Sequence, residues 1–358
     1  MADRSLSDFV EKISGESHLR VEHDFGDGFV RLHTSEAERR QAAQDIQCSE
    51  NILLEMMRNS KDAHGSRIFI ALGKEGPRRT ITVIDNGDGI PQAMHGHIFE
   101  PRVTSKLDTS HRDAWGLHGR GMALYSIAQN AEEARVVCSE EGKGASLQAV
   151  TDTTALPERS DQSSFPTFTL NERGEVAVRG PRNLLRCACE FAIEARDSCT
   201  ICIGSPAEIA AALWAYGSAS LTPASRVFCK DPEELPLIKR LATAEDPAAF
   251  AAMAASLGLG LSERTARRIM DGQVLPAIPL LEQITIEDPR KPAAKAARPK
   301  PRAKGLSLTG ADRDLLAAGA KDAFGAIAQD YYLEGDVQPT VAVGPRSLTI
   351  TIPLVPSA

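Results

Sequence analysis

The chain has 358 residues, of which 42% are hydrophobic and 25% are charged, and its formal net charge at pH 7 is −7. This length allows two or three domains, and the composition excludes wholesale disorder and fibrous repeats. Because the whole chain is negative, it is not a general polyanion binder, and any nucleic-acid contact requires a local basic patch. We recognise no signal peptide, and the apolar stretch 248–261 is too short to span a bilayer, so we expect no membrane association.

The seven cysteines are an odd number in a chain with no recognisable export signal. We therefore expect a cytoplasmic protein with free thiols. Four of these cysteines have a spacing that could hold a tetrahedral zinc ion, but they lie among apolar residues typical of a packed core, so both interpretations stay open. They are Cys187, Cys189, Cys199 and Cys202.

Helices and strands alternate along the first part of the chain. Residues 35–63 are predicted to form one long helix, which begins with a capping box made by Ser35 and Glu38. The apolar patterns that follow predict strands at 67–72 and 80–84, a helix at 121–130, and a hairpin of 134–138 and 145–150. A polar stretch at 151–166 is interpreted as a domain edge.

The second half of the chain continues the alternation, which is typical of an α/β protein. We expect a hairpin at 168–179, a helix at 182–196, a strand at 199–203, a helix at 206–216, a helical pair at 247–272, a helix at 310–331, and strands at 340–343 and 347–353. The predicted domains are therefore a first α/β domain at 1–160, a second at 165–288, a basic Pro/Ala linker at 289–305, and a C-terminal helix with two strands at 306–358.

The first motif that carries chemistry is a polar stripe on the predicted helix 35–63. At about 100° per residue, Glu55, Asn59 and Asp62 share one face, while an apolar face can pack on a sheet. An amide oxygen suits Mg²⁺, and a glutamate can hold and deprotonate a water molecule. An ordinary solvated helix face has the same pattern, so the stripe decides nothing by itself.

The second motif is an aspartate at the end of the predicted strand 80–84, followed by two glycines. A carboxylate fixed there, as at Asp85, can accept a hydrogen bond from an exocyclic amine such as that of adenine. Gly87 and Gly89 would let the backbone approach a flat ring closely. A plain β-turn is the alternative, because Asn-Gly and Asp-Gly are common turn pairs.

The third motif is a run of three glycines before the predicted helix 121–130. Gly116, Gly119 and Gly121 would leave backbone N–H groups exposed at a helix start, where anions bind. A flexible glycine-rich loop is the alternative.

Taken together and in this order, the three motifs resemble those of the GHKL ATPase superfamily, which includes gyrase B subunits, the ninety-kilodalton chaperones, histidine kinases and MutL. Glu-x-x-x-Asn-Ser-x-Asp-Ala at 55–63 is similar to the N box, Asp-x-Gly-x-Gly at 85–89 to the adenine-binding box, and Gly-x-x-Gly-x-Gly at 116–121 to the final glycine box. The segment 97–106 is similar both to the kinase Ile-Phe-Glu-Pro segment and to the Thr-Ser-Lys of MutL. The resemblance covers roughly residues 35–150.

This resemblance implies an α+β sandwich of the GHKL (Bergerat) type, in which helices cover one face of a mixed sheet. The implied ligands are ATP and Mg²⁺, with Glu55 as the general base, Asn59 as a ligand of Mg²⁺, and Asp85 as the acceptor of the adenine amine. Gly87 and Gly89 would shape the adenine pocket. The other nucleotide-site residues, around the phosphates or in a mobile lid, would be Asp62, Thr104, Ser105, Lys106, Gly116, Gly119, Arg120 and Gly121.

Hydrolysis of ATP is favoured over phosphotransfer, because the histidines that precede Glu55 lack the sequence context of a kinase phospho-acceptor. Nucleotide-driven formation of a homodimer is a further implication of the resemblance. The alternatives are a DNA-associated ATPase similar to MutL or a topoisomerase, and a non-hydrolysing nucleotide-gated scaffold or histidine-kinase-like protein.

Residues 256–269 are similar to a helix-turn-helix, with Ala266 and Ile269 facing the core. Arg264, Arg267 and Arg268 would then give the second helix a cationic face suited to DNA, and the basic linker at 290–304 could add salt-sensitive, non-specific affinity. A helical hairpin with solvated arginines and a solubilising tether are the alternative interpretations.

Overall fold

The computed structural model describes residues 21–26, 28–105, 111–113, 116–118, 121–159, 161–171, 176–222, 224–225, 229, 231–287, 310–328, 333–343 and 348–355. The chain divides into two compact units, Met1–Asp288 and Pro289–Ala358. Every residue predicted for the nucleotide site belongs to the first unit.

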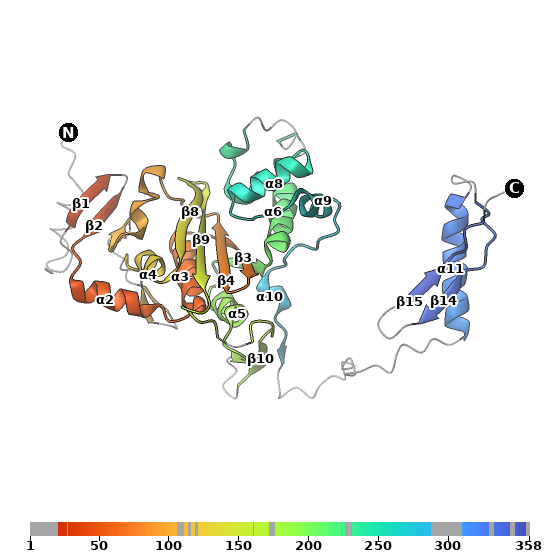
Figure 1. Ribbon diagram of the computed structural model, residues 1–358, viewed down its shortest axis with the longest axis horizontal. Helices are drawn as coiled ribbons and strands as arrows, with labels where there is room; N and C mark the ends of the chain where they lie inside the picture. Colours follow the sequence, from red (N-terminus) through yellow and green to blue (C-terminus); the bar gives the residue numbers. More distant parts are fainter. Residues whose placement is uncertain are drawn as a thin grey trace. The chain divides into compact units, whose positions relative to one another are not determined.

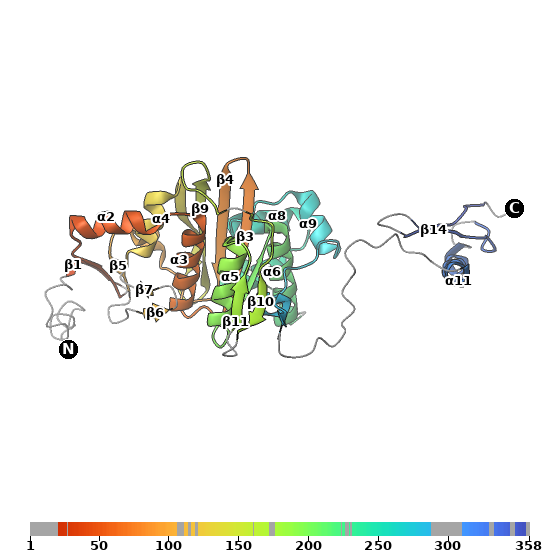
Figure 2. The ribbon, with the colours of Figure 1, turned by 90° about the horizontal axis from the view of Figure 1, so that it is seen from below.

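A five-stranded mixed sheet forms the centre of the first unit (Figures 1 and 2). Its strands are β3 (Arg67–Glu75), β4 (Arg78–Asp85), β8 (Glu133–Glu140), β9 (Gly144–Asp152) and β12 (Thr200–Gly204). They lie in the order β12-β3-β4-β9-β8, and every neighbouring pair is antiparallel except β12 and β3, which are parallel. The predicted mixed sheet covered by helices is confirmed.

One face of this sheet is covered by α3 (Ser49–Asp62), α4 (Ala123–Asn130) and α5 (Leu184–Glu194). The apolar stripe of α3 packs against Ile68 and Ile70 of β3, and Ile52 and Met57 in that stripe are fully buried. α5 lies beside α3 and adds Phe191 to the same core. Because the apolar side of α3 packs on the sheet and on α5, its polar stripe faces away from the sheet.

The opposite face is covered by α6 (Pro206–Ser220), η4 (Leu237–Thr243), α8 (Pro247–Ser256) and α9 (Glu263–Met270). Phe69 and Ala71, which alternate with the isoleucines of β3, pack into this second core. The expected layer over one face is present as α3 and α4, whereas the second layer, which comes from residues after 205, was not expected. The physical reason is that β3 is apolar at every position from Ile68 to Ala71, which is typical of a strand buried on both faces.

The segment 165–288 was predicted to be a separate domain, but β12 completes the sheet that contains β3, and α5 packs beside α3. The polar stretch before it is bonded to the sheet and to α3. Glu158 pairs with Arg79 and Lys74, while Glu50 accepts hydrogen bonds from the backbone N of Arg159 (3.2 Å) and the side chain of Gln162 (2.7 Å). The polar stretch is therefore attached to the sheet and to α3 through these hydrogen bonds and does not separate two domains.

The predicted long helix at 35–63 is two helices, α2 (Glu36–Asp45) and α3. Its predicted capping box is present, with Ser35 and Glu38 bonded to each other's backbone N–H groups. The chain becomes extended at Ile46 and Cys48, which are 4% and 5% exposed. The interruption turns both side chains into the core, which a continuous amphipathic helix would not do.

Short strands complete the first unit. β1 (Val21–Gly26), β2 (Phe29–Leu32) and β5 (Val103–Thr104) form one small antiparallel sheet, β6 (His111–Asp113) pairs with β7 (Gly116–His118), and β10 (Thr167–Leu170) pairs with β11 (Val176–Arg179) and β13 (Ile286–Glu287). The remaining short helices are η1 (Gln92–Met94), η2 (His97–Phe99), η3 (Pro232–Glu234) and α10 (Leu280–Gln283).

The second unit contains α11 (Gly310–Ala328) and the antiparallel pair β14 (Thr340–Val343) and β15 (Leu348–Thr351). Among the residues that the structure describes, no helix is both long and apolar enough to cross a membrane.

Candidate functional site

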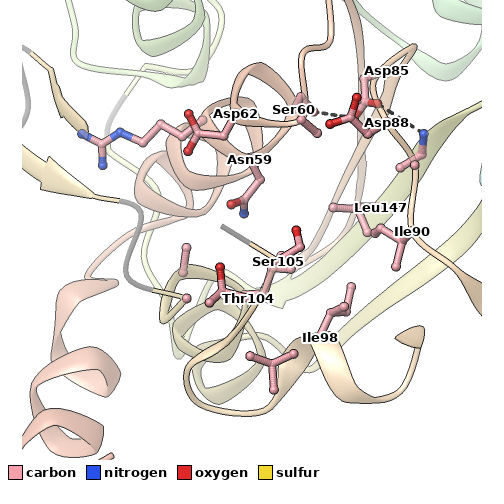
Figure 3. A pocket seen from close by; sticks show the side chains of 18 of the residues that line it. Asn59, Ser60, Asp62, Asp85, Asp88, Ile90, Ile98, Thr104, Ser105 and Leu147 are labelled. Atoms are coloured by element: carbon pink, nitrogen blue, oxygen red, sulfur yellow. Dashed lines mark hydrogen bonds between the residues drawn. The ribbon is translucent and has the colours of Figure 1, made fainter. Parts of the chain in front are cut away.

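The polar stripe of α3 forms one wall of a cavity in the first unit. Glu55, Asn59 and Asp62, which the sequence places on one helix face, all line it. In Figure 3 the amide of Asn59 points from the helix toward Thr104 and Ser105 on the other side of the cavity. The Nδ2 atom of this amide is buried and has no hydrogen-bond partner, so the site contains a polar group that the protein leaves unsatisfied.

Glu55 is bonded to an arginine one turn along the same helix. Arg58 Nη1 donates to Glu55 Oε1, and both side chains line the cavity. The exposed fraction of the side chain is 19% for Glu55 and 8% for Arg58, so the pair is largely removed from bulk water. The N-box pattern does not specify Arg58, because this residue lies at a variable position between Glu55 and Asn59.

Asp85 closes the far end of the cavity, at the end of β4. Its Oδ2 accepts from the hydroxyl of Ser60 at 2.7 Å, and its Oδ1 accepts from the backbone N–H groups of Gly87 (2.9 Å) and Ala145 (3.2 Å). A carboxylate offers about four lone-pair sites, so these three donors leave room for about one more. That remaining site matches a single exocyclic amine of a ligand.

The carboxyl group of Asp85 is only 3% exposed. Burial raises its pKa above the ordinary value of an aspartate, although the hydrogen bonds from Ser60, Gly87 and Ala145 act in the opposite direction. Because burial disfavours the charged form, a ligand that donates a further hydrogen bond to this carboxylate would offset part of that cost.

The glycines after Asp85 are needed for packing of the protein backbone. A Cβ atom on Gly87 would overlap the carbonyl oxygen of Ala63 at the end of α3, and one on Gly89 would overlap the carbonyl oxygen of Glu140 in the β8–β9 hairpin. Gly89 also has a φ of +76°, which L side chains rarely adopt. Only Gly89 lines the cavity, so the glycines act mainly by letting three elements meet behind Asp85.

Thr104 and Ser105 lie on the wall that faces α3, and Gly121 lies just before α4. Thr104 belongs to β5, which pairs with β2, so the beginning of the predicted lid is attached to the N-terminal strands. Arg102 strengthens this attachment, because its side chain pairs with Glu38 of α2 and its carbonyl accepts from Leu32 N at 3.1 Å.

The floor of the cavity is apolar and its walls are polar. The space between atoms amounts to about 1060 Å³, part of it open to solvent. Its lining residues to which the motifs gave no role are Phe29, Arg58, Ser60, Ala63, Asp88, Ile90, Ile98, Val103, Ala123, Leu124, Ala145 and Leu147. A polar end at α3 and an apolar floor near Asp85 suit a ligand with a charged part and a flat heterocyclic part.

Some predicted residues cannot be placed in this way. Lys106, Gly119, Arg120 and the linker 290–304 lie outside the described residues, and only the backbone of Gly116, in β7, is described. Of the other residues predicted for the nucleotide site, only Gly87 does not line the cavity. Its backbone N–H donates to Asp85, which does line it.

The cysteines are free thiols, and those near α5 are deeply packed. Burial raises the pKa of Cys187 far above its ordinary value, that of Cys189 to about 12, and that of Cys202 to about 11. Because zinc binds thiolates, this environment is unfavourable to it. Among the described residues, no three His, Cys, Asp or Glu side chains are grouped as a metal site.

Comparison with known proteins agrees with this geometry. Residues 45–155 match the model of the family described as histidine kinase-, DNA gyrase B-, and HSP90-like ATPase. Residues 45–155 form a GHKL ATPase domain. This stretch contains α3, β4, η2, β5, α4 and β9, and every residue that lines the cavity except Phe29.

Curated relatives of this GHKL domain include two MutL proteins. The chain is 31% identical over 122 residues to the DNA mismatch repair protein MutL of Staphylococcus epidermidis (strain ATCC 12228 / FDA PCI 1200), covering 33% of this chain and 18% of the relative. It is 32% identical over 117 residues to the MutL of Staphylococcus aureus (strain Newman), covering 32% of this chain and 17% of the relative. The chain thus spans less than a fifth of the length of these relatives. The similarity supports an ATP-binding protein of the GHKL type.

Proposed function

We propose that the GHKL domain of this chain is a Mg²⁺-dependent ATPase. The observation that carries the proposal is the convergence of Glu55 and Asn59 from α3 with Asp85 from β4 on one cavity. These elements are adjacent in space because α3 packs on the sheet that contains β4.

Asp85 is proposed to bind the adenine ring. Its remaining acceptor site would take the hydrogen bond from the exocyclic amine, while Ile90, Ile98 and Leu147 provide the apolar surface for the ring. Guanine carries a carbonyl oxygen at the corresponding ring position, and an acceptor facing an acceptor is unfavourable. The arrangement therefore favours adenine nucleotides.

Glu55 is proposed to act as the general base. It would hold a water molecule and accept one of its protons while the water oxygen bonds to the γ-phosphorus. The bond between that phosphorus and the β,γ-bridging oxygen breaks, and the electron pair leaves with ADP. The products are ADP and inorganic phosphate, and the proton on Glu55 returns to solvent.

The residues present suit a magnesium ion that arrives with the triphosphate. Asn59 would supply an amide oxygen to the ion. Its buried Nδ2 atom, which has no hydrogen-bond partner, would donate to a phosphate oxygen instead. Bound there, Mg²⁺ would neutralise phosphate charge. A site with few protein ligands is typical of Mg²⁺, which keeps phosphate oxygens and water as its other ligands.

The phosphates are proposed to lie toward Asp62, Thr104 and Ser105, which lie away from Asp85 in Figure 3, and toward Gly121, which also lines the cavity. By the resemblance, Lys106, Gly116, Gly119 and Arg120 would complete this end, and Lys106 or Arg120 would neutralise charge that develops on the γ-phosphate.

The test is ATP turnover by the purified chain and by Glu55→Gln. We expect Glu55→Gln to bind ATP with unchanged affinity and to lose about 100-fold or more in kcat, because only proton acceptance is removed. Asp85→Asn should instead weaken ATP binding measured by calorimetry. Turnover that survives Glu55→Gln would disprove the assignment of the base.

ATP binding by the wild-type chain without turnover would favour the nucleotide-gated scaffold. Sedimentation with and without ATP tests the homodimer that the resemblance implies.

A second candidate is a DNA-associated ATPase, favoured by the surface of α9. Arg264, Arg267 and Arg268 are exposed, while Ala266 and Ile269 on the other side of the helix are buried, as the helix-turn-helix pattern predicts. Ser262 is the N-cap of α9, and its hydroxyl accepts a hydrogen bond from Thr265 N at 3.2 Å. The relatives' name, DNA mismatch repair protein, points to the same partner.

Gel retardation of duplex DNA across a range of salt concentrations tests this candidate. The variant Arg264→Ala/Arg267→Ala/Arg268→Ala should lose affinity and show a shallower salt dependence, because phosphate contacts release counterions. Arg179→Ala/Arg182→Ala/Arg196→Ala removes the same charge from exposed positions elsewhere in the first unit and should bind as the wild type does. Equal losses in both variants, or no retardation at low salt, would rule out α9 as the DNA surface.

A further inference from the structure

The ion pair between Glu55 and Arg58 is a feature of the cavity that the proposed roles above do not use. The two residues are three positions apart on α3, which places their side chains side by side on the helix surface. Arg58 is part of the cavity wall, although it is one of the most buried charged residues of this helix.

An arginine in this position restricts the orientation of the Glu55 carboxylate. The guanidinium group is planar and always protonated, so a hydrogen bond from Nη1 to Oε1 restricts rotation of the carboxylate. A carboxylate has about four lone-pair sites, so a hydrogen bond from Arg58 is compatible with acceptance of a proton from water. Glu55 can therefore be held by Arg58 and still accept a proton from water.

The burial of the pair increases the effect of losing either partner. With 8% exposure, the Arg58 side chain cannot be replaced easily by water, so its loss would remove a buried hydrogen bond from the Glu55 carboxylate. Asn59, the next residue, has an unsatisfied amide atom, so the helix presents a fixed acid and an open amide in one turn.

We propose that Arg58 is a positioning residue for hydrolysis, which holds Glu55 in the orientation that accepts the proton of the attacking water. The inference rests on the proposed function, because it assigns Arg58 a role only through Glu55. It predicts that Arg58 affects the rate of the chemical step and leaves the affinity for ATP unchanged.

The test is a double-mutant cycle on the full chain, with kcat, KM and ATP affinity measured for each variant. Arg58→Ala should lower kcat by about 10- to 100-fold with little change in KM, because misplaced catalytic groups cost rates of this order. Arg58→Lys should recover part of the loss, since a lysine keeps the charge but not the planar geometry. In a Glu55→Gln background, Arg58→Ala should lower the residual rate by less than about 3-fold, because residues that act as a unit are not additive.

The outcomes separate this inference from the proposed function. A wild-type chain that binds ATP without turnover overturns the proposed hydrolysis and the role of Arg58 with it. Turnover that Arg58→Ala leaves unchanged or increases overturns the role of Arg58 alone. A loss of ATP affinity in Arg58→Ala, or a full effect in the Glu55→Gln background, would mean that Arg58 acts on the nucleotide directly and would also overturn it. Lys61→Ala, on the same helix but outside the cavity lining, is the matched control and should leave kcat unchanged.

Discussion

Asp85 combines a structural role with the proposed ligand contact. Its carboxylate joins Ser60 of α3, Gly87 of the following loop and Ala145 of β9, so three parts of the domain meet on one side chain. The motif identified Asp85 from its position at the end of a strand. The N-box pattern includes Ser60, which directly follows Asn59, but it gives this residue no role, because its partner Asp85 lies 25 residues further along the chain.

The glycine at 89 offers a test of backbone packing at a single residue. In Gly89→Ala the new Cβ would overlap the Glu140 carbonyl and hold a φ of +76°, and we expect a loss of about 3 kcal/mol or more in the free energy of unfolding. Gly76→Ala is the matched control, because φ there is +57° but no atom lies within 4 Å, and it should cost about 1 kcal/mol. Urea denaturation measures both values, and equal losses would contradict the packing explanation.

At the scale of elements, the most informative segment is the polar stretch after β9. Glu158 is bonded to Arg79 of β4 and Lys74 of β3, and its side chain is 5% exposed. Burial alone would raise its pKa, but the hydrogen bonds from Arg79 and Lys74 prevail and hold the pKa below its ordinary value. The segment is thereby attached to the sheet, although its composition resembles that of a linker.

The bonds of Glu158 to Arg79 and Lys74 predict a pH dependence of the free energy of unfolding. A carboxyl whose pKa is lowered on folding stabilises the protein above its unfolded-state pKa, and this contribution is lost as pH falls from about 4.5 through the folded-state value. Glu158→Gln should therefore lower the free energy of unfolding by about 1–3 kcal/mol at pH 7, and the difference from the wild type should shrink below pH 4. Denaturant unfolding from pH 3 to 7 measures it. A difference that does not vary with pH would contradict this explanation.

In the first unit, the position of β12 beside β3 determines which fragments of the chain we expect to fold by themselves. Without residues after 160 the sheet would lose β12 beside β3, α5 beside α3, and the second helical layer over Phe69. We expect a fragment of residues 1–160 to aggregate through the exposed edge and apolar face, and a fragment of residues 1–288 to be monomeric or dimeric with a cooperative melt. Size-exclusion chromatography and thermal unfolding test this. A fragment 1–160 that is soluble and binds ATP would show that the second layer is dispensable.

Strand β9 lies between the proposed ATP site and the loop that connects α8 to α9. Along β9, Ala145 and Leu147 line the cavity, while Ser146 points to the other face and donates to the carbonyl of Leu257, directly after α8, at 2.8 Å. Gln148 likewise donates to the carbonyl of Gly258 at 3.2 Å. The alternation of side chains in one strand therefore places the two proposed surfaces on opposite faces of the same sheet.

The sequence by itself determined the local chemistry of this protein. Helical spacing placed Glu55, Asn59 and Asp62 on one face, and a strand end followed by glycines marked Asp85, because these patterns depend on residues that are close along the chain. The tertiary structure decided what depends on distant residues: that β12 joins β3, that helices cover both faces, and that Ser60 bonds to Asp85. Such contacts follow from burial of the whole chain, and no local pattern records which distant side chain will supply the partner.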